Sequence, residues 1–180
     1  MKRCKWCNVN NSLYVYYRDK EWGVLNTNDK YLFEMLILES FQAGLSWECI
    51  LNKRLSFKEA YDNFDIKKVI DYDDKKIEKL LNNKDIIRNK LKIQASISNA
   101  KIFKNIQKEH GSFYKYLCQF IKEKPIFEIG KTTNNLSDII SKDLIKRGMK
   151  FVGSTTIYSY LQATGFIYSH DKECFLFRNN

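Results

Sequence analysis

Apolar and polar residues recur along this chain mostly at the spacing of α-helices, and the clearest case is residues 31–54. The apolar positions in the first half of this stretch share helix-face spacing: Leu32, Phe33, Leu36, Ile37 and Phe41. Gly44 follows Ala43, and a glycine lets a helix stop and the chain turn. Ser46 is a suitable N-cap for a second helix that opens with Trp47. The pattern predicts a helix, a tight turn and a second helix.

One acidic residue, Glu39, interrupts this apolar run. A carboxylate that is buried without a partner is strongly unfavourable, so a buried Glu39 would need a group to satisfy it. A simpler interpretation places Glu39 at the edge of the helix, where it reaches water. Composition alone leaves both interpretations open.

Further amphipathic segments predict more helices. They are expected over residues 13–20, 56–64, 86–107, 113–122, 137–147 and 154–165, with two short Asp-capped helices within 64–86. Asn28 or Asp29 is expected to cap the helix that contains Glu39. Residues 126–136 are expected to form an exposed connection, and no segment alternates convincingly as a strand. The pattern therefore predicts an all-α fold.

Length and composition agree with one domain that spans residues 1–180. Of the 180 residues, 44% are hydrophobic, which is enough to form a core. The chain has one proline and seven glycines, and so few turn-forming residues favour helices. Neither a repeat nor a low-complexity linker divides the chain.

The formal net charge of the chain is +10 at pH 7. Lysines that neutralise phosphates release counterions, so a nucleic acid is a natural partner for a basic protein. Aromatic residues make up 14% of the chain, which suits a protein that stacks bases. A basic surface that binds no particular polyanion remains the alternative.

No apolar run is long enough to span a bilayer, and the basic N-terminus lacks the apolar segment of a signal peptide. A cytoplasmic protein is therefore expected. Its five cysteines would be thiols or metal ligands rather than disulfides. Cys49 and Cys118 have apolar helical surroundings and are expected to be core thiols.

The remaining cysteines lie near the two termini. Cys4 and Cys7 form a C-x2-C pair, and His170 and Cys174 form an H-x3-C pair. Together they make a Cys3His set with zinc-like spacing, and a metal between them would join the chain ends. A chance pair at each end is the alternative. A redox role for the C-x2-C pair is less favoured, because no βαβ pattern surrounds it.

Residues 137–165 predict a helix-hairpin-helix unit. A short turn between the two helices carries Gly148 and Gly153, and the second helix starts at Ser154. Glycines let backbone N–H groups approach a phosphate, and the N-terminal dipole of the second helix favours an anion. Nearby Lys146, Arg147 and Lys150 add positive charge; a plain helical hairpin in a core is the alternative.

Five sequence blocks in a fixed order resemble one known family. They are R-C-x-W from Arg3, E-W-G from Glu21, L-E-S-x-Q-A-G-L-S-W at residues 38–47, K-R-G-x-K-F-V-G-S-T-T at residues 146–156, and H-x3-C from His170. This combination resembles the bacterial 3-methyladenine DNA glycosylase I (constitutive Tag) family of the helix-hairpin-helix glycosylase superfamily. The resemblance extends from Arg3 to Cys174.

The resemblance implies a helical glycosylase fold with an aromatic pocket for the damaged base. Its aromatic residues would be Tyr14, Tyr17, Trp22 and Trp47, with Glu39 as the pocket acid and candidate catalytic residue. The residues implied at the DNA are Gln42, Gly44 and Leu45, which probe the duplex, and Gly148, Lys150, Gly153 and Ser154, which hold the backbone.

The resemblance also implies a structural zinc site that closes segments 1–18 and 166–180. Cys4, His170 and Cys174 match three ligands, but Arg18 stands where the family has a histidine ligand, and an arginine cannot serve as one. Cys7 is the candidate for the fourth position.

The expected activity is hydrolysis of the N-glycosidic bond of 3-methyladenine in alkylated double-stranded DNA. A monomeric, monofunctional enzyme would release free 3-methyladenine and leave an abasic site. The main alternative is a non-catalytic binder of alkylated or distorted DNA. A zinc-stapled helical interaction domain is another, whereas an iron–sulfur glycosylase is disfavoured because a four-cysteine run is missing.

Overall fold

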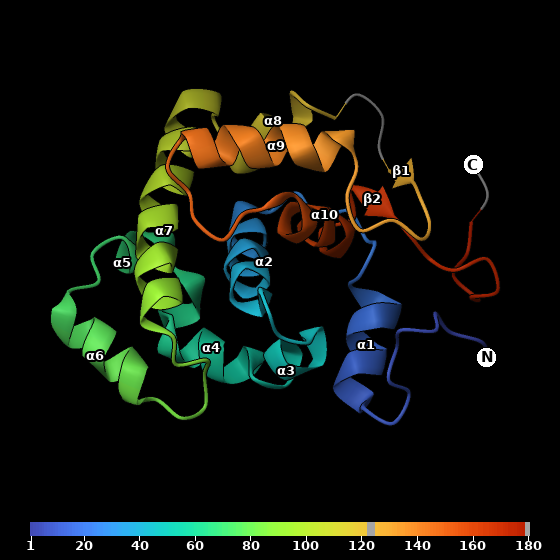
Figure 1. Ribbon diagram of the computed structural model, residues 1–180, viewed down its shortest axis with the longest axis horizontal. Coiled ribbons are helices and arrows are strands. Elements are labelled where there is room, and N and C mark those ends of the chain that lie inside the picture. Colours follow the sequence, from blue (N-terminus) through green and yellow to red (C-terminus); the bar gives the residue numbers. More distant parts are fainter. Residues whose placement is uncertain (122–124, 179–180) are drawn as a thin grey trace.

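The computed structural model describes residues 1–121 and 125–178 and is built almost entirely of helices (Figure 1). The first half contains α1 (Ser12–Lys20), α2 (Asp29–Gln42), α3 (Trp47–Asn52), α4 (Arg54–Ala60), the 3-10 helix η1 (Asp62–Phe64), α5 (Ile66–Val69) and α6 (Asp74–Asn82). The second half contains α7 (Lys90–His110), α8 (Phe113–Cys118), β1 (Ile126–Phe127), α9 (Asn135–Lys146), α10 (Ser154–Ala163) and β2 (Ile167–Tyr168). The predicted all-α class is confirmed.

Helix α2 is the centre of the structure (Figure 1). Its residues 32–41 are all buried, and it contacts α3, α7, α8, α10 and η1. Such a helix is apolar on every side because its neighbours surround it. Asn28 caps it by accepting a hydrogen bond from the backbone N–H of Lys30, as predicted. After Gln42 the chain turns at Gly44, whose φ is +79°.

The predicted second helix of this region is also present as α3. The Ser46 side chain caps it by accepting a hydrogen bond from the backbone N–H of Cys49. The next predicted helix, over residues 56–64, is instead divided into α4 and η1, with a left-handed residue at Asn63 (φ 57°). The two short Asp-capped helices are α5 and α6, capped by Asp65 and Asp73.

The longest helix begins later and ends later than its predicted span of 86–107. Asn89 caps α7 by accepting from the N–H of Lys92, so the chain before it is not helical. Gly111, with φ +84°, ends the helix after His110. Helix α8 is shorter than predicted, since it ends at Cys118, and the predicted end at Lys122 lies outside the described residues.

Two further details correct the sequence analysis. Residues 126–127 and 167–168 form a parallel pair, although no strand was expected; two residues are too few to show alternation. Cys49 and Cys118 are half-buried rather than core thiols. Each lies on a short helix that is only partly covered by the rest of the protein.

Helices α9 and α10 lie against each other and are joined by a short turn, as predicted for residues 137–165. Helix α9 starts two residues earlier, because Asn134 is the N-cap and Ser137 completes a capping box instead of being the cap itself. None of the described helices has both the length and the apolar character needed to cross a membrane.

Candidate functional site

A cavity of about 350 Å³ opens beside the C-terminal end of α2. Its lining includes all five residues predicted for the pocket: Tyr14, Tyr17, Trp22, Glu39 and Trp47. Helices α1, α2 and α3 supply four of them, and Trp22 lies just after α1. The cavity is also lined by Gln42, by Ser159 and Gln162 of α10, and by residues near both termini. Its volume suits one small ligand.

Aromatic rings form two walls of the cavity. The rings of Tyr17 and Trp47 are 5.1 Å apart between centroids and form one wall. The other wall contains Trp6, which is 4.7 Å from Trp22 and 5.6 Å from Tyr14. Trp6 was not predicted as a pocket residue, although it belongs to the R-C-x-W block at the N-terminus. Its position depends on how the N-terminus folds back onto α1.

Glu39 is the acid of this cavity, and its side chain is buried. The residue is only 4% exposed, so the interpretation that it reaches water at the helix edge is wrong. Among the described residues, its carboxyl group has no hydrogen-bond or ion-pair partner. Burial therefore raises the pKa of Glu39 to about 8. Without a cation beside it, the acid is therefore mostly protonated at neutral pH, and a cation in the cavity would favour its ionised form.

The two tyrosines remain neutral beside this acid. Burial raises the pKa of Tyr14 to about 12, and the pKa of Tyr17 also rises through burial and the nearby Glu39 charge. The indole Nε1 of Trp47 is buried and has no hydrogen-bond partner in the described part of the chain. The cavity thus contains polar groups without protein partners, which is typical of a site that binds a polar ligand.

The turn after α2 is next to the cavity. Gln42 lines the cavity, and the backbone N–H of Leu45 donates a 2.6 Å hydrogen bond to the Gln42 carbonyl. Leu45 is 41% exposed at the tip of this turn. Lys92 of α7 holds the turn in place, because its Nζ donates to the carbonyls of Phe41 (2.8 Å) and Ala43 (2.6 Å). Lys92 was not predicted as a functional residue; its buried amine satisfies the free carbonyls at the end of α2.

The turn between α9 and α10 has a fixed backbone. Gly148 adopts φ +98°, and the buried Asn99 side chain makes two hydrogen bonds with the backbone of Lys150 (2.9 and 2.8 Å). The Lys150 side chain is exposed. The N-terminus of α10 has Gly153 as N-cap and no side-chain cap. Its first N–H groups therefore have no side-chain acceptor from that position.

Two side chains near this turn already have partners within the protein, which the sequence did not predict. Arg147 is paired with Glu109 and Asp143, both at 2.7 Å, so its charge is already neutralised. The Ser154 hydroxyl donates to Asp138 and lies 2.8 Å from the Ser137 hydroxyl. Lys150 is the exposed cation on the turn itself.

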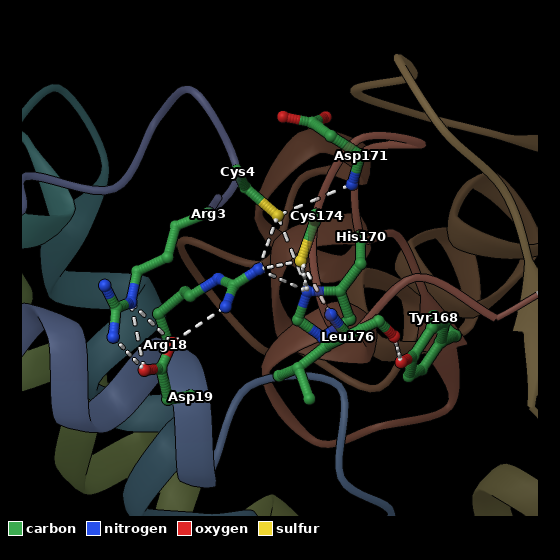
Figure 2. Close-up of polar contacts among 9 residues, drawn as sticks. All are labelled: Arg3, Cys4, Arg18, Asp19, Tyr168, His170, Asp171, Cys174 and Leu176. Carbon is green, nitrogen blue, oxygen red and sulfur yellow. Dashed lines mark hydrogen bonds and ion pairs between the residues drawn. The ribbon is translucent and has the colours of Figure 1, made fainter. Parts of the chain in front are cut away.

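A second polar cluster joins the chain termini, and Figure 2 shows its contacts. The ligand atoms of Cys4, His170 and Cys174 lie within 4.8 Å of one another and are buried. Arg18 of α1 points into this group: its Nη2 donates to Cys4 Sγ at 3.2 Å and to Cys174 Sγ, and lies 3.3 Å from His170 Nδ1. Three of the four predicted ligands are therefore together.

Cys7, the fourth predicted ligand, is not part of the Cys4, His170 and Cys174 group, although it is buried. The three grouped residues could hold a metal ion. They do not fit a four-coordinate zinc ion while Arg18 stays between them, because a guanidinium has no lone pair to donate and carries a positive charge.

Comparison with known proteins identifies the family of this chain. The methyladenine glycosylase family model matches residues 6–178. DNA-3-methyladenine glycosylase 1 of Escherichia coli is 38% identical over all of this chain and 99% of that protein. A crystal structure of 3-methyladenine DNA glycosylase I superposes with a TM-score of 0.93 at 38% identity, covering 97% of this chain and 99% of that one.

A crystal structure of a variant of 3-methyladenine DNA glycosylase I in complex with 3-methyladenine is also similar. It has a TM-score of 0.91 at 32% identity and covers 97% of this chain and 96% of that chain. These similarities extend over the cavity, the turn after α2 and both termini. The resemblance seen in the sequence is confirmed, and the chain belongs to the methyladenine glycosylase family.

Proposed function

We propose that this protein is a monofunctional DNA glycosylase that hydrolyses the N-glycosidic bond of 3-methyladenine in alkylated DNA. The observation that carries the proposal is a buried acid without a protein partner in an aromatic cavity that suits one base. Relatives named as DNA-3-methyladenine glycosylases, at 36–38% identity, support the same activity. Release of the base leaves an abasic site for later repair.

Selectivity follows from the charge of the substrate. Adenine that is methylated at N3 in DNA carries a positive charge, which makes it both a better leaving group and a cation. Aromatic faces attract cations by about 0.5–2 kcal/mol each when water is excluded. Tyr14, Tyr17, Trp22 and Trp47 supply such faces, and Trp6 extends them. An unmethylated adenine, which is neutral, gains none of this attraction.

Glu39 would supply the partner charge for the flipped base. Before a base binds, the raised pKa of Glu39 keeps its carboxyl group protonated near neutral pH. A cationic base lowers that pKa, so binding releases the proton and forms an ion pair in a dry site. As the glycosidic bond breaks, positive charge moves from the base to the sugar, and the Glu39 carboxylate can stabilise it. The base leaves as neutral 3-methyladenine, and solvent water adds to the sugar carbon and loses a proton to the solvent, which leaves a hydroxyl group on the sugar.

The contacts of Lys131, which lines the cavity, and of Lys92, which holds the turn after α2, favour hydrolysis rather than a Schiff-base mechanism. The Lys92 amine is engaged with two backbone carbonyls below the turn. Lys131 lines the cavity but forms a 2.8 Å ion pair with Glu128. A charged, paired amine is a poor nucleophile, so the enzyme is expected to release the base without cleaving the strand.

Two turns of the protein would contact the DNA. Leu45, at the exposed tip of the turn after α2, would fill the gap left by the flipped base, with Gln42 and Gly44 beside it. The unit formed by α9 and α10 would act as the helix-hairpin-helix element. There the backbone at Gly148, Gly153 and Ser154, together with Lys150, would hold a phosphate of the DNA.

Zinc is the ion that the terminal donor set would prefer, because two thiolates and an imidazole are typical zinc ligands. Such an ion would be structural, since the group lies outside the lining of the cavity. Cys7 would have to move to complete the site, and Arg18 would have to withdraw from it.

The remaining parts of the proposal concern the whole molecule. We take residues 1–180 as one glycosylase domain that acts as a monomer on double-stranded DNA in the cytoplasm. This chain by itself supplies the cavity, both turns and Lys150, so the proposed reaction needs no residue from a second subunit.

The test is release of free base from methylated duplex DNA. Wild type is compared with Glu39→Gln and with Glu59→Gln, which makes the same substitution at an exposed position on α4. Wild type and Glu59→Gln should release 3-methyladenine selectively, and Glu39→Gln should do so much more slowly. Tight binding of methylated DNA without release would favour the non-catalytic binder. Neither binding nor release would contradict both functions.

A further inference from the structure

The Arg18 guanidinium occupies the centre of the terminal group rather than its edge. A single nitrogen atom, Nη2, contacts both thiol sulfurs and the imidazole Nδ1 (Figure 2). A metal held by the same three atoms would need that position, because all three donors point to it. Guanidinium and metal are therefore alternatives, and the side chain of Arg18 is completely buried.

Several neighbours of Arg18 stabilise its buried charge. Its Nη1 donates to the Asp19 carboxylate at 2.7 Å, and the same carboxylate accepts hydrogen bonds from Arg3. The ring of Phe175 lies 5.0 Å from the guanidinium carbon, which adds a cation–π contact. A buried arginine is retained only when such partners compensate its desolvation.

We propose that Arg18 replaces the metal ion as the cationic centre that joins the two ends of this chain. The two ends are then held together without zinc. Arg18 is part of α1, Cys4 belongs to the N-terminal segment, and His170 and Cys174 belong to the C-terminal segment. One side chain therefore links three parts of the chain, which is the task of a structural metal.

The contacts around the group extend this role to the cavity. The His170 ring lies 4.8 Å from Trp22, and Trp22 lies 4.7 Å from Trp6. Cys4 is two residues before Trp6, and the neighbours of His170 on both sides, Ser169 and Asp171, line the cavity. Arg18 thus acts as a positioning residue for one aromatic wall and does not itself line the cavity.

The experiment measures zinc content and thermal stability, with and without a chelator, in protein purified from zinc-supplemented medium. Arg18→His supplies the imidazole that the family places here, and Arg18→Met removes the charge at similar length. Arg3→Met is the matched control, because Arg3 pairs with Asp19 without touching the sulfurs or His170. Neither readout depends on base excision, so the result is separate from that of the proposed function.

Wild type and Arg3→Met should contain little zinc, and a chelator should leave their Tm unchanged. Arg18→Met should lower Tm by about 10 °C, because it leaves buried polar groups without their partner. Arg18→His should take up one zinc per chain and become sensitive to the chelator, which also covers the case that Arg18→Met does not fold.

Three results would overturn the proposal. Stoichiometric zinc in wild type, with a Tm that falls on chelation, would show that Arg18 leaves the site. An unchanged Tm in Arg18→Met would show that Arg18 does not join the termini. An Arg18→His variant that binds no zinc would show that Arg18 is not what stands in place of the metal.

Discussion

Glu39 and Arg18 are both charged residue types that the fold buries, yet their surroundings are opposite. Arg18 makes contacts with Asp19, two thiols, an imidazole and an aromatic ring, and every one of them comes from the protein. Glu39 has an aromatic cavity in front of it, and among the described residues no group is paired with its carboxyl. Among the described residues the Nε atom of Arg18 has no partner, but its two terminal nitrogens are held by groups of the protein. A buried charge held in this way joins parts of a structure, whereas an acid without any partner marks a place for a ligand.

The difference also appears in the protonation of the two side chains. The contacts of Arg18 with Cys4 and Asp19 outweigh burial and raise its pKa, so the guanidinium is always charged. Burial raises the pKa of Glu39 to about 8, so its charge appears only when a cation or a higher pH favours it. The charge of Arg18 is therefore the same with or without a ligand, whereas the charge of Glu39 changes when a cationic base binds.

The largest expected effect is on stability at the terminal group. Arg18→Met should lower the free energy of unfolding by about 3–5 kcal/mol, because it removes one partner from a buried charged network. Urea unfolding at pH 7 measures this change. Arg3→Met, whose side chain is partly exposed, should cost only about 1 kcal/mol. Equal losses in the two variants would mean that Arg18 contributes no more to stability than Arg3 does.

Glu39→Gln should slow base excision by about 100-fold or more, as expected when a preorganised charge at the reacting centre is lost. Single-turnover release of 3-methyladenine measures the effect, with Glu59→Gln as control. If Glu39→Gln excised the base as fast as wild type, the acid would be only a structural residue of the cavity.

The same substitution should stabilise the empty protein. The unfolded chain ionises Glu39 near its ordinary pKa of 4.5, whereas the folded protein keeps the proton until about pH 8. The folded state therefore binds more protons between these values, so stability falls as pH rises from 4.5 to 8 and levels off outside this range. Removing the acid should gain about 1–3 kcal/mol at pH 7 and little at pH 5. Urea titrations at both pH values test this; a loss at pH 7 would contradict an unpartnered acid.

Base excision should become faster as the pH rises, whereas the stability of the protein falls. The ionised form of Glu39 pairs with the cationic base, so kcat/KM should rise by up to tenfold per pH unit toward pH 8 and then level off. The profile of Glu39→Gln should be flat over the same range. A wild-type profile that falls between pH 6 and 8 would assign the opposite protonation state to the active enzyme.

An effect of similar or smaller size is expected at the turn that carries Leu45. Lys92→Met leaves the carbonyls of Phe41 and Ala43 without their donor, which should cost about 1–3 kcal/mol of stability. Excision from duplex DNA should fall more than binding of free 3-methyladenine, because the cavity itself is intact. Equal losses in the two assays would mean that Lys92 supports the cavity rather than the turn.

Much of the fold followed from local patterns in the sequence. Apolar periodicity placed most of the helices, and Asn28, Ser46, Asp65 and Asp73 act as caps at the expected helix starts. Boundaries failed where caps lay outside the pattern, as at Asn89 and Asn134. The two-residue strands were missed because their pairing joins segments about 40 residues apart.

By itself, the sequence determined the all-α class and the resemblance to the family, because motif blocks and periodicity are properties of the chain order. Through that resemblance it also indicated five of the residues that line the cavity. The tertiary structure alone decided that Glu39 is buried without a partner, that Trp6 joins the aromatic wall and that Cys7 lies outside the terminal group. It also decided that Arg18 points between Cys4, His170 and Cys174. Each of these depends on contacts between distant segments, whose geometry is set by how helices pack around α2.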